Sequence, residues 1–171
     1  MKPLILFVGS SNSGKTTLMA SIISRLRELG FKVGAIKHAP HGFQFFKGKD
    51  SSLHKIAGAK VSIVSGPDML GILKDTAKDM TPFELMGYME GVDLVLVEGF
   101  KRLPLPKIEV FNPGSEGDLP LCLGDPNLKA IVSTRPLNVG VPIFDPRDIE
   151  SITRFVLELT GLERGDSQRS P

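Results

Sequence analysis

The chain has 171 residues, which is the length of one domain and is long enough to bury a hydrophobic core. Hydrophobic residues make up 41% of the chain and charged residues 23%, which excludes a disordered protein, a collagen and a coiled coil. The net charge of +2 is too small to indicate a nucleic-acid partner through bulk charge.

The sequence contains nothing that reads as a membrane segment. Its first apolar run, residues 4–8, is too short for a signal peptide and is followed by polar, Gly-rich sequence. No other stretch approaches the roughly 18 apolar residues of a membrane-spanning helix. A single cysteine, Cys122, excludes an internal disulfide. We therefore expect a soluble, cytoplasmic protein with no membrane partner.

The first half of the chain alternates strands and helices. Residues 4–8 form a continuous apolar run that ends in glycine, as expected of a strand buried on both faces. Apolar residues recur at helical spacing over 14–29, and Gly30 supplies the stop signal. Further strands are predicted at residues 31–36, 61–65 and 70–73, with a helix at 50–59.

The second half continues the alternation. Thr81 and Pro82, followed by Glu84 in the first turn, predict a helix from Pro82 to about residue 90. The apolar run 94–98 predicts another buried strand. Two more strands are predicted at 107–111 and 130–133, and a last helix, capped by Asp148, runs to about residue 159.

This order of elements predicts a single α/β domain with a mainly parallel sheet flanked by helices. The domain is expected to span residues 1–161, and residues 162–171 are expected to form a flexible C-terminal tail. Between the first strand and the first helix, residues 9–16 match the pattern G-x-x-x-x-G-K-[ST] at every fixed position. The predicted fold is therefore of the P-loop NTPase type.

The chemistry of a phosphate site explains this motif. Backbone N–H groups of the loop and the positive end of the following helix converge on an anion. Lys15 should reach the outer two phosphates, Thr16 should ligate Mg²⁺ and Thr17 is placed for the innermost phosphate. The alternative is a Gly/Ser-rich turn without a ligand. The expected phosphate-binding residues are Gly9, Ser10, Ser11, Asn12, Ser13, Gly14, Lys15, Thr16 and Thr17.

A P-loop site also needs a carboxylate at the end of a neighbouring strand to hold Mg²⁺ or its water. Glu98 ends the strand 94–98 and is followed by Gly99, so we assign this role to it. Asp93 begins the same strand and is interpreted as structural. Asp50 could orient attacking water or could simply cap a helix, and spacing does not separate these readings. The catalytic candidates are Lys15, Asp50 and Glu98.

Other polar and aromatic residues give weaker signals. His38 and His41 are three apart, but no third residue has a spacing suited to a zinc site, so Lys37 and His38 are expected to face the nucleotide or a partner surface. Three phenylalanines could pack in the core or form a contact patch for another subunit. They are Phe43, Phe45 and Phe46.

Several motifs beyond the P-loop, spread from residue 4 to about 159, resemble the MobB family, the P-loop GTP-binding proteins of molybdopterin-guanine dinucleotide biosynthesis. The matching segments are Ile36-Lys37-His38, Gly48-Lys49-Asp50-Ser51, Ala57-Gly58-Ala59, Asp93 to Lys101 (DLVLVEGFK) and Pro106-Lys107-Ile108-Glu109-Val110.

The resemblance implies a homodimeric, GTP-binding protein with weak, Mg²⁺-dependent GTPase activity. Such proteins assist the MobA-type guanylyltransferase that attaches GMP to molybdopterin, so molybdopterin itself is a further candidate ligand. Carried over by position, Thr16 and Glu98 would serve Mg²⁺, and Asp50 would belong to a segment that responds to the nucleotide. The preference for guanine comes from the resemblance alone, because no Asn-Lys-x-Asp occurs in the chain.

Two alternative functions remain open. One is an adaptor that binds nucleotide or pterin with little or no hydrolysis, which is favoured by Phe45-Phe46-Lys47 standing where the family usually has an acid. The other is a small-molecule kinase or a metal-insertion GTPase on the same fold. The scattered arginines do not form the Arg-rich lid of a kinase, and the loop with His38 and His41 is poor in metal ligands.

Overall fold

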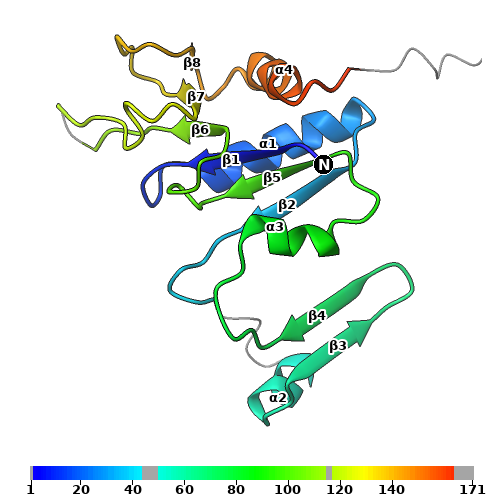
Figure 1. Cartoon of the computed structure of the whole chain (residues 1–171). Helices are drawn as coiled ribbons and strands as arrows, with labels where there is room; N and C mark the ends of the chain where they lie inside the picture. The colour runs from blue at the N-terminus through cyan, green and yellow to red at the C-terminus, as the bar shows by residue number, and fades with distance from the viewer. Residues whose placement is uncertain (1, 44–49, 115–116, 164–171) are drawn as a thin grey trace, which may run out of the picture. The chain divides into compact units, whose positions relative to one another are not determined.

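The computed structural model describes residues 2–43, 50–114 and 117–163, and its contacts fall into two compact units. The sheet unit comprises the chain up to His38 and from Met86 onward, and the hairpin unit comprises Ala39–Leu85 (Figure 1). The predicted domain limit at residue 161 stays a prediction, and most of the predicted tail lies outside the described residues. None of the described helices is long and apolar enough to cross a membrane.

The sheet unit is built on a six-stranded sheet in which every described pairing is parallel. Its spatial order is β2-β5-β1-β6-β7-β8, so β1 is central and the carboxyl ends of the strands share one edge. This confirms the predicted fold class. The strands are β1 (Leu4–Val8), β2 (Val33–Lys37), β5 (Leu94–Glu98), β6 (Lys107–Val110), β7 (Leu128–Val132) and β8 (Ile143–Phe144).

Two helices, α1 (Lys15–Glu28) and α4 (Ile149–Thr160), pack with one face of this sheet. Alternate residues of the central strands, such as Ile5 and Phe7, join the apolar stripe of α1 in one core cluster. Leu6 and Val8 of β1 and Val95 and Val97 of β5 are buried as well, because strands covered on both faces expose neither side to water. The continuous apolar runs of the sequence reflect this double burial.

The strand β6 contains two charged side chains that are fully buried. The Nζ atom of Lys107 donates hydrogen bonds to Asp125 Oδ2 at 2.5 Å and to the Lys101 carbonyl at 2.8 Å. The carboxylate of Glu109 accepts from the backbone N–H groups of Leu121 and Cys122, at 2.6 and 2.8 Å. These bonds attach the loop between β6 and β7 to the sheet, since each buried charge is matched by partners from that loop or its neighbour.

The thiol of Cys122 is part of this buried region. Burial, reinforced by the nearby Glu109 carboxylate, raises the pKa of the thiol to about 11. The Lys107 ammonium, by contrast, holds the pKa of Asp125 at about 2. Cys122 is therefore a protonated packing residue near neutral pH, without the character of a nucleophile.

The hairpin unit contains α2 (Asp50–Ile56), β3 (Val61–Ser65), β4 (Leu70–Lys74) and α3 (Pro82–Leu85). The strands β3 and β4 pair antiparallel in a two-stranded sheet of their own. Thr81 and Glu84 form the predicted capping box: the Thr81 N–H donates to Glu84 Oε2 at 2.8 Å, and the Glu84 N–H donates to Thr81 Oγ1 at 3.3 Å.

The helix predicted at 50–59 ends at Ile56, strand bounds shift by one or two residues, and two larger differences from the sequence prediction have a physical cause. The helix predicted from Pro82 to about residue 90 ends at Leu85 and continues only as a 3₁₀ turn, η1 (Met86–Tyr88), in a stretch that contains Gly87, a poor helix former. The strand β8 was not predicted, because two residues between prolines are too short to form a periodic pattern.

Candidate functional site

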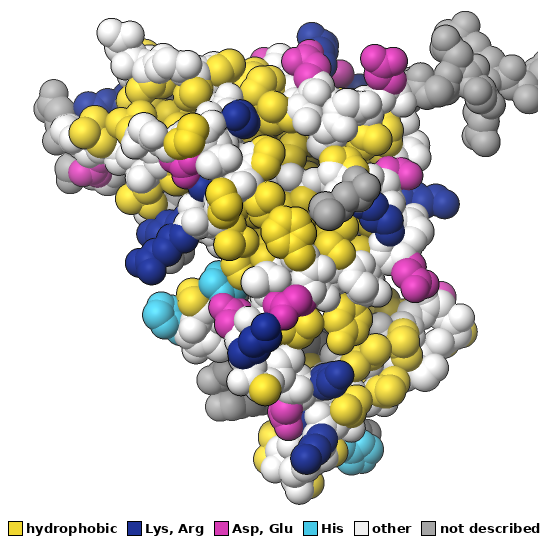
Figure 2. All heavy atoms as spheres, viewed as in Figure 1, with side chains coloured by type: hydrophobic (Ala, Val, Ile, Leu, Met, Phe, Trp, Pro, Cys, Tyr) yellow, Lys and Arg dark blue, Asp and Glu magenta, His cyan; other side chains and the backbone are white. Residues whose placement is uncertain are grey.

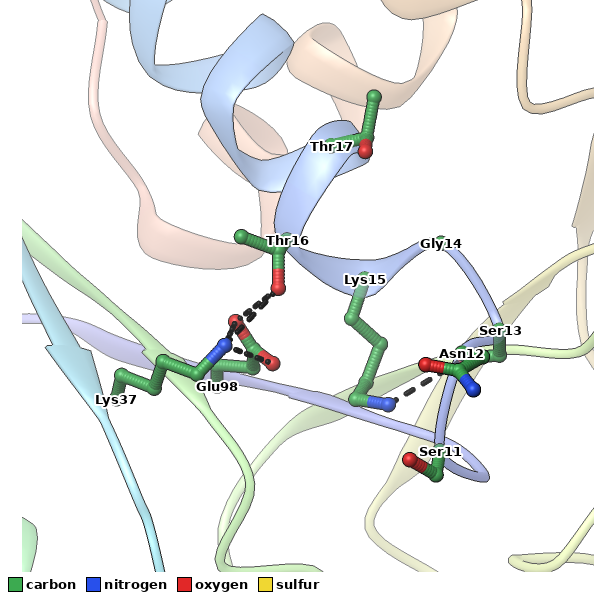
Figure 3. A pocket seen from close by; sticks show the side chains of 9 residues that line it. All are labelled: Ser11, Asn12, Ser13, Gly14, Lys15, Thr16, Thr17, Lys37 and Glu98. Carbon is green, nitrogen blue, oxygen red and sulfur yellow. Dashed lines mark hydrogen bonds and ion pairs between the residues drawn. The ribbon is translucent and has the colours of Figure 1, made fainter. Parts of the chain in front are cut away.

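An open pocket of about 400 Å³ lies at the carboxyl edge of the sheet (Figure 3). It is lined by residues 11–17, which connect β1 to the first turn of α1, and by the last residues of β2 and β5, Lys37 and Glu98. These two residues face each other in the sheet register, and Glu98 also pairs with Phe7 of β1. Parallel strand order thus brings three segments far apart in the sequence to one place.

The glycines of the motif are required by the backbone of this loop. Gly9 has φ +143°, and a Cβ atom there would lie 2.3 Å from the carbonyl oxygen of Val110, closer than any real contact. Gly14 enters α1 with φ +96°, a left-handed conformation that costs glycine little. Asn12, with φ 60°, is one of the few residue types that tolerate the same region. The loop is therefore held close to the end of β6.

No side-chain hydrogen bond from the described residues caps the N-terminus of α1. Gly14, its N-cap residue, can supply no capping oxygen, and the first turn contains no acidic residue. By contrast, α4 is capped by Asp148, which accepts from the Ser151 N–H at 3.0 Å, and has Glu150 in its first turn. The first N–H groups of a helix need acceptors, so the start of α1 is suited to an external anion.

Lys15 adds a fixed cation beside these N–H groups. Its Nζ atom donates to the carbonyl oxygen of Ser10 at 2.5 Å and lies 3.4 Å from Ser13 Oγ. Burial lowers the pKa of Lys15, the charge of Glu98 opposes this, and the neighbouring charge of Lys37 lowers it further. A bound anion would counter both effects that disfavour the ammonium, which makes Lys15 a suitable partner for phosphate.

Thr16, Glu98 and Lys37 form a hydrogen-bonded group at the other side of the pocket (Figure 3). Thr16 Oγ1 donates to Glu98 Oε2 at 2.8 Å. Lys37 Nζ donates to Thr16 Oγ1 at 3.1 Å and to the two Glu98 oxygens at 3.1 and 3.3 Å. A hydroxyl and a carboxylate are the hard oxygen donors that Mg²⁺ prefers, so Thr16 and Glu98 fit the predicted metal role.

Thr16 and Glu98 would supply two oxygens of a magnesium shell. Among the described residues, no group of three or more His, Cys, Asp or Glu side chains is arranged to hold a metal ion. This agrees with the usual binding of Mg²⁺, which keeps several waters and takes one or two protein oxygens together with those of a nucleotide.

The chain turns sharply after Glu98, as its following glycine predicted. Gly99 has φ +104°, and a Cβ atom there would lie 2.8 Å from the Cβ atom of His38. Phe100 also has positive φ, 53°, and its ring stacks on the imidazole of His38 with centroids 4.0 Å apart. The stack joins the segments that follow β2 and β5. The strained conformation of Phe100 thus lies beside the carboxylate of the site.

The predicted site residues are only partly brought together. Lys15, Thr16, Thr17 and Glu98 line one pocket. Asp50 begins α2 in the hairpin unit, and its side chain lies outside the described part of the chain, so its role stays a prediction.

The structure bears on three further features of the sequence. Asp93 is structural as expected, since its Oδ2 atom accepts from the Lys32 N–H at 2.7 Å at the opposite end of the strand. Phe43 is described and 74% exposed, whereas Phe45 and Phe46 lie outside the described residues. Sequence reasoning missed the bond between Lys37 and Glu98, because it depends on β2 being the neighbour of β5.

A family model and two known proteins similar in sequence to this chain all point to the same protein family. The model of the family described as Molybdopterin guanine dinucleotide synthesis protein B, MobB, matches residues 4–134. The chain is 34% identical over 170 residues to the Molybdopterin-guanine dinucleotide biosynthesis adapter protein of Escherichia coli (strain K12), covering 96% of this chain and 97% of that protein. The chain is also 32% identical over 167 residues to the Probable molybdopterin-guanine dinucleotide biosynthesis adapter protein of Bacillus subtilis (strain 168). This match covers 93% of this chain and 94% of that protein.

Solved structures agree in fold and in sequence. The crystal structure of Bacillus subtilis MobB superposes with a TM-score of 0.76 and 32% identity, and the match covers 94% of this chain and 99% of that one. A second crystal structure, of molybdopterin-guanine biosynthesis protein B, gives a TM-score of 0.73 at 25% identity and covers 93% of this chain.

Proposed function

The chain belongs to the MobB family, and from this premise we propose that it is an adapter protein of molybdopterin-guanine dinucleotide biosynthesis that binds GTP with Mg²⁺. In this proposal its nucleotide state supports a MobA-type guanylyltransferase. The observation that carries the proposal is the uncapped N-terminus of α1 with Lys15 beside it, at the edge of the sheet where parallel α/β folds bind ligands.

The groups that line the pocket support the binding of a triphosphate. The loop N–H groups and the positive end of α1 would hold phosphate oxygens, and Lys15 would bind the outer two phosphates. Thr16 and Glu98 would hold Mg²⁺, which supplies neutralisation of the phosphate charge when bound. The guanine base is assigned from family membership.

We propose that hydrolysis at this site is slow. Among the described residues that line the pocket, the carboxylate is that of Glu98, and it is already hydrogen-bonded to Thr16 and Lys37. A strong general base would need a free carboxylate or imidazole within reach of the attacking water. Asp50 is proposed as the residue that orients this water, consistent with the position of its motif in the family.

Calorimetric titration with GTP, GDP and ATP in the presence of Mg²⁺ tests the proposal, followed by an assay of phosphate release. GTP should bind in preference to ATP, and phosphate should be released slowly. Lys15→Ala should weaken triphosphate binding at least about a hundredfold, because the site loses its fixed cation. Lys32→Ala is the matched control, since it removes the same charge beyond the far end of β2. Tight Mg²⁺-dependent binding by Lys15→Ala would contradict the P-loop assignment.

The second candidate function is an adaptor that binds nucleotide or pterin without hydrolysing it. The engaged state of Glu98 favours this candidate over an efficient GTPase. Binding of GTP without any phosphate release over hours would select it. A preference for ATP would instead favour a small-molecule kinase.

We also propose that the protein works as a cytoplasmic homodimer. In the hairpin unit, Val61, Ile63, Leu70 and Ile72 lie on one face of the two-stranded sheet and are each 45–60% exposed. Figure 2 shows apolar side chains at the surface over these strands. An exposed apolar face of this kind is typical of a surface that a partner covers. Sedimentation should give a dimer, and Ile63→Asp should shift it toward monomer without loss of GTP binding.

A further inference from the structure

Lys37 bonds to the same oxygen atoms that a metal ion would need. Its Nζ atom lies 3.1 Å from Thr16 Oγ1 and 3.1 and 3.3 Å from the two oxygens of Glu98 (Figure 3). These are the hydroxyl and the carboxylate that fit a magnesium role. We propose that Lys37 is a built-in counter-ion that competes with a divalent metal ion for Thr16 and Glu98. This inference rests on the proposed nucleotide function and concerns the regulation of that same site.

The exposure of the two partners suits an exchange of cations. The Glu98 side chain is 13% exposed and is held at the end of β5, whereas the Lys37 side chain is 62% exposed. The lysine stem has four flexible carbons and can carry the ammonium away from the carboxylate without disturbing the strand. The anion is therefore the fixed member of the pair and the cation is the exchangeable one.

The hydrogen bonds place the two cations in competition for the same oxygens. Thr16 Oγ1 donates its proton to Glu98 and accepts one from Lys37. Mg²⁺ requires oxygen ligands at about 2.0–2.1 Å in near-octahedral geometry, which leaves no room for an ammonium on the same lone pairs. Two positive charges on one carboxylate also repel each other. Metal binding therefore weakens or displaces the hydrogen bonds of Lys37 to these oxygens.

Displacement leaves Lys37 in the pocket that the phosphates would enter, since its side chain lines that pocket together with Lys15. Without metal, the Lys37 ammonium lies beside Glu98. With metal, the metal ion lies beside Glu98 and Lys37 remains in the same pocket. Two consequences follow: the site binds metal more weakly than Thr16 and Glu98 alone would, and nucleotide binding depends less on metal than in a site without the lysine.

The first test titrates the full chain with Mn²⁺ alone, without nucleotide, and follows free Mn²⁺ by electron paramagnetic resonance. Lys37→Met should tighten Mn²⁺ binding about tenfold, because the competing cation is removed while the stem is kept. Lys37→Arg should bind Mn²⁺ about as the wild type does. Lys32→Met removes an equal charge beyond the other end of β2 and should leave binding unchanged. Equal or weaker Mn²⁺ binding by Lys37→Met would overturn the proposal.

A second background separates competition from a general effect of charge. Lys37→Met combined with Glu98→Gln should bind Mn²⁺ no more tightly than Glu98→Gln alone, because the carboxylate for which the two cations compete is gone. A gain that persisted in this double variant would also overturn the proposal. The thermal transition of each variant verifies that it is folded.

The nucleotide titration distinguishes this inference from the proposed function. In EDTA the wild type should retain more of its GTP affinity than Lys37→Met does, by about tenfold. If no variant binds GTP with or without Mg²⁺, the proposed function fails while the Mn²⁺ titration still decides the inference. If GTP binds but its Mg²⁺ requirement is the same in wild type and Lys37→Met, the inference fails alone.

Discussion

The ion pair of Lys107 with Asp125 and that of Lys37 with Glu98 lie at opposite edges of one sheet, since Lys107 begins β6 whereas Lys37 and Glu98 end β2 and β5. The Lys107 side chain is completely buried, and its partner is 28% exposed. In the second pair it is the lysine that is open to water, at 62%. The molecule thus contains two ammonium–carboxylate pairs. We call Lys107–Asp125, whose lysine is buried, the closed pair, and Lys37–Glu98, whose lysine is exposed, the open pair.

The difference shows which interactions of this fold are structural and which are available for exchange. A buried ammonium cannot regain its hydration if the carboxylate is removed, so the Lys107 pair has to persist for the fold to persist. The exposed ammonium of Lys37 loses little when it moves into water, so its carboxylate can serve another cation. We expect loss of the closed pair to reduce the stability of the fold, and changes in the open pair to alter the binding of metal and nucleotide instead.

Asp125→Ala should have the largest effect, lowering the free energy of unfolding by about 3–5 kcal/mol, because it leaves Lys107 charged and unpaired in the interior. Urea denaturation followed by circular dichroism measures this. In Lys107→Met combined with Asp125→Ala, most of the lost stability should return, since no uncompensated charge remains. A double variant as unstable as Asp125→Ala would show that the pair is not the cause.

Glu98→Gln should leave the free energy of unfolding within about 1 kcal/mol of the wild type and weaken Mg²⁺-dependent nucleotide binding about 10- to 100-fold. The amide keeps the shape of the side chain but removes the charge that a metal ion needs. Calorimetry in Mg²⁺ and in EDTA measures the binding change. Unaltered Mg²⁺ dependence in this variant would remove Glu98 from the metal site.

Acid should weaken the closed pair in a defined range of pH. The bond from Lys107 lowers the pKa of Asp125 from its ordinary value of 3.8 to about 2. Because the folded-state pKa is the lower one, the stabilisation is complete above about pH 4 and is lost as pH falls through about 2. The difference in stability between wild type and the Lys107→Met, Asp125→Ala double variant, measured from pH 5 to 2, should change in this range.

Lys37→Met should have the smallest effect on folding, within about 0.5 kcal/mol, since exposed ion pairs contribute little to stability. Thermal denaturation at low and high salt measures it. A loss comparable to that of Asp125→Ala would mean that the two pairs play the same role, and the comparison would fail.

The parts of the site that could be predicted from sequence are those encoded locally. Gly9, Gly14, Lys15 and Thr16 are separated by fixed steps in the sequence; the backbone conformation explains the two glycines, and side-chain chemistry explains Lys15 and Thr16. Glu98 could be predicted because a buried apolar strand ends at it and a glycine follows. In each of these cases the predictive signal lies in residues that are close to one another in the sequence.

Contacts that depend on strand order could not be predicted. Lys37 meets Glu98 because β2 lies beside β5 in matching register, and an exposed lysine at a strand end gives no sign of its neighbour. Lys107 and Glu109 lie in a strand that alternates charged and apolar residues, a pattern typical of one exposed face. Their burial follows from partners in the β6–β7 loop, which no periodicity indicates.

The hairpin unit lies in the connection between β2 and β5, which are adjacent parallel strands. Such a crossover needs only about 10–12 residues, yet here it includes the whole of Ala39–Leu85. Most of this length is not needed to join the strands in register. The length of this connection can therefore vary without a change in the parallel pairing of β2 with β5. A unit with an exposed apolar face is in this way inserted into the chain while the six-stranded sheet keeps its own register.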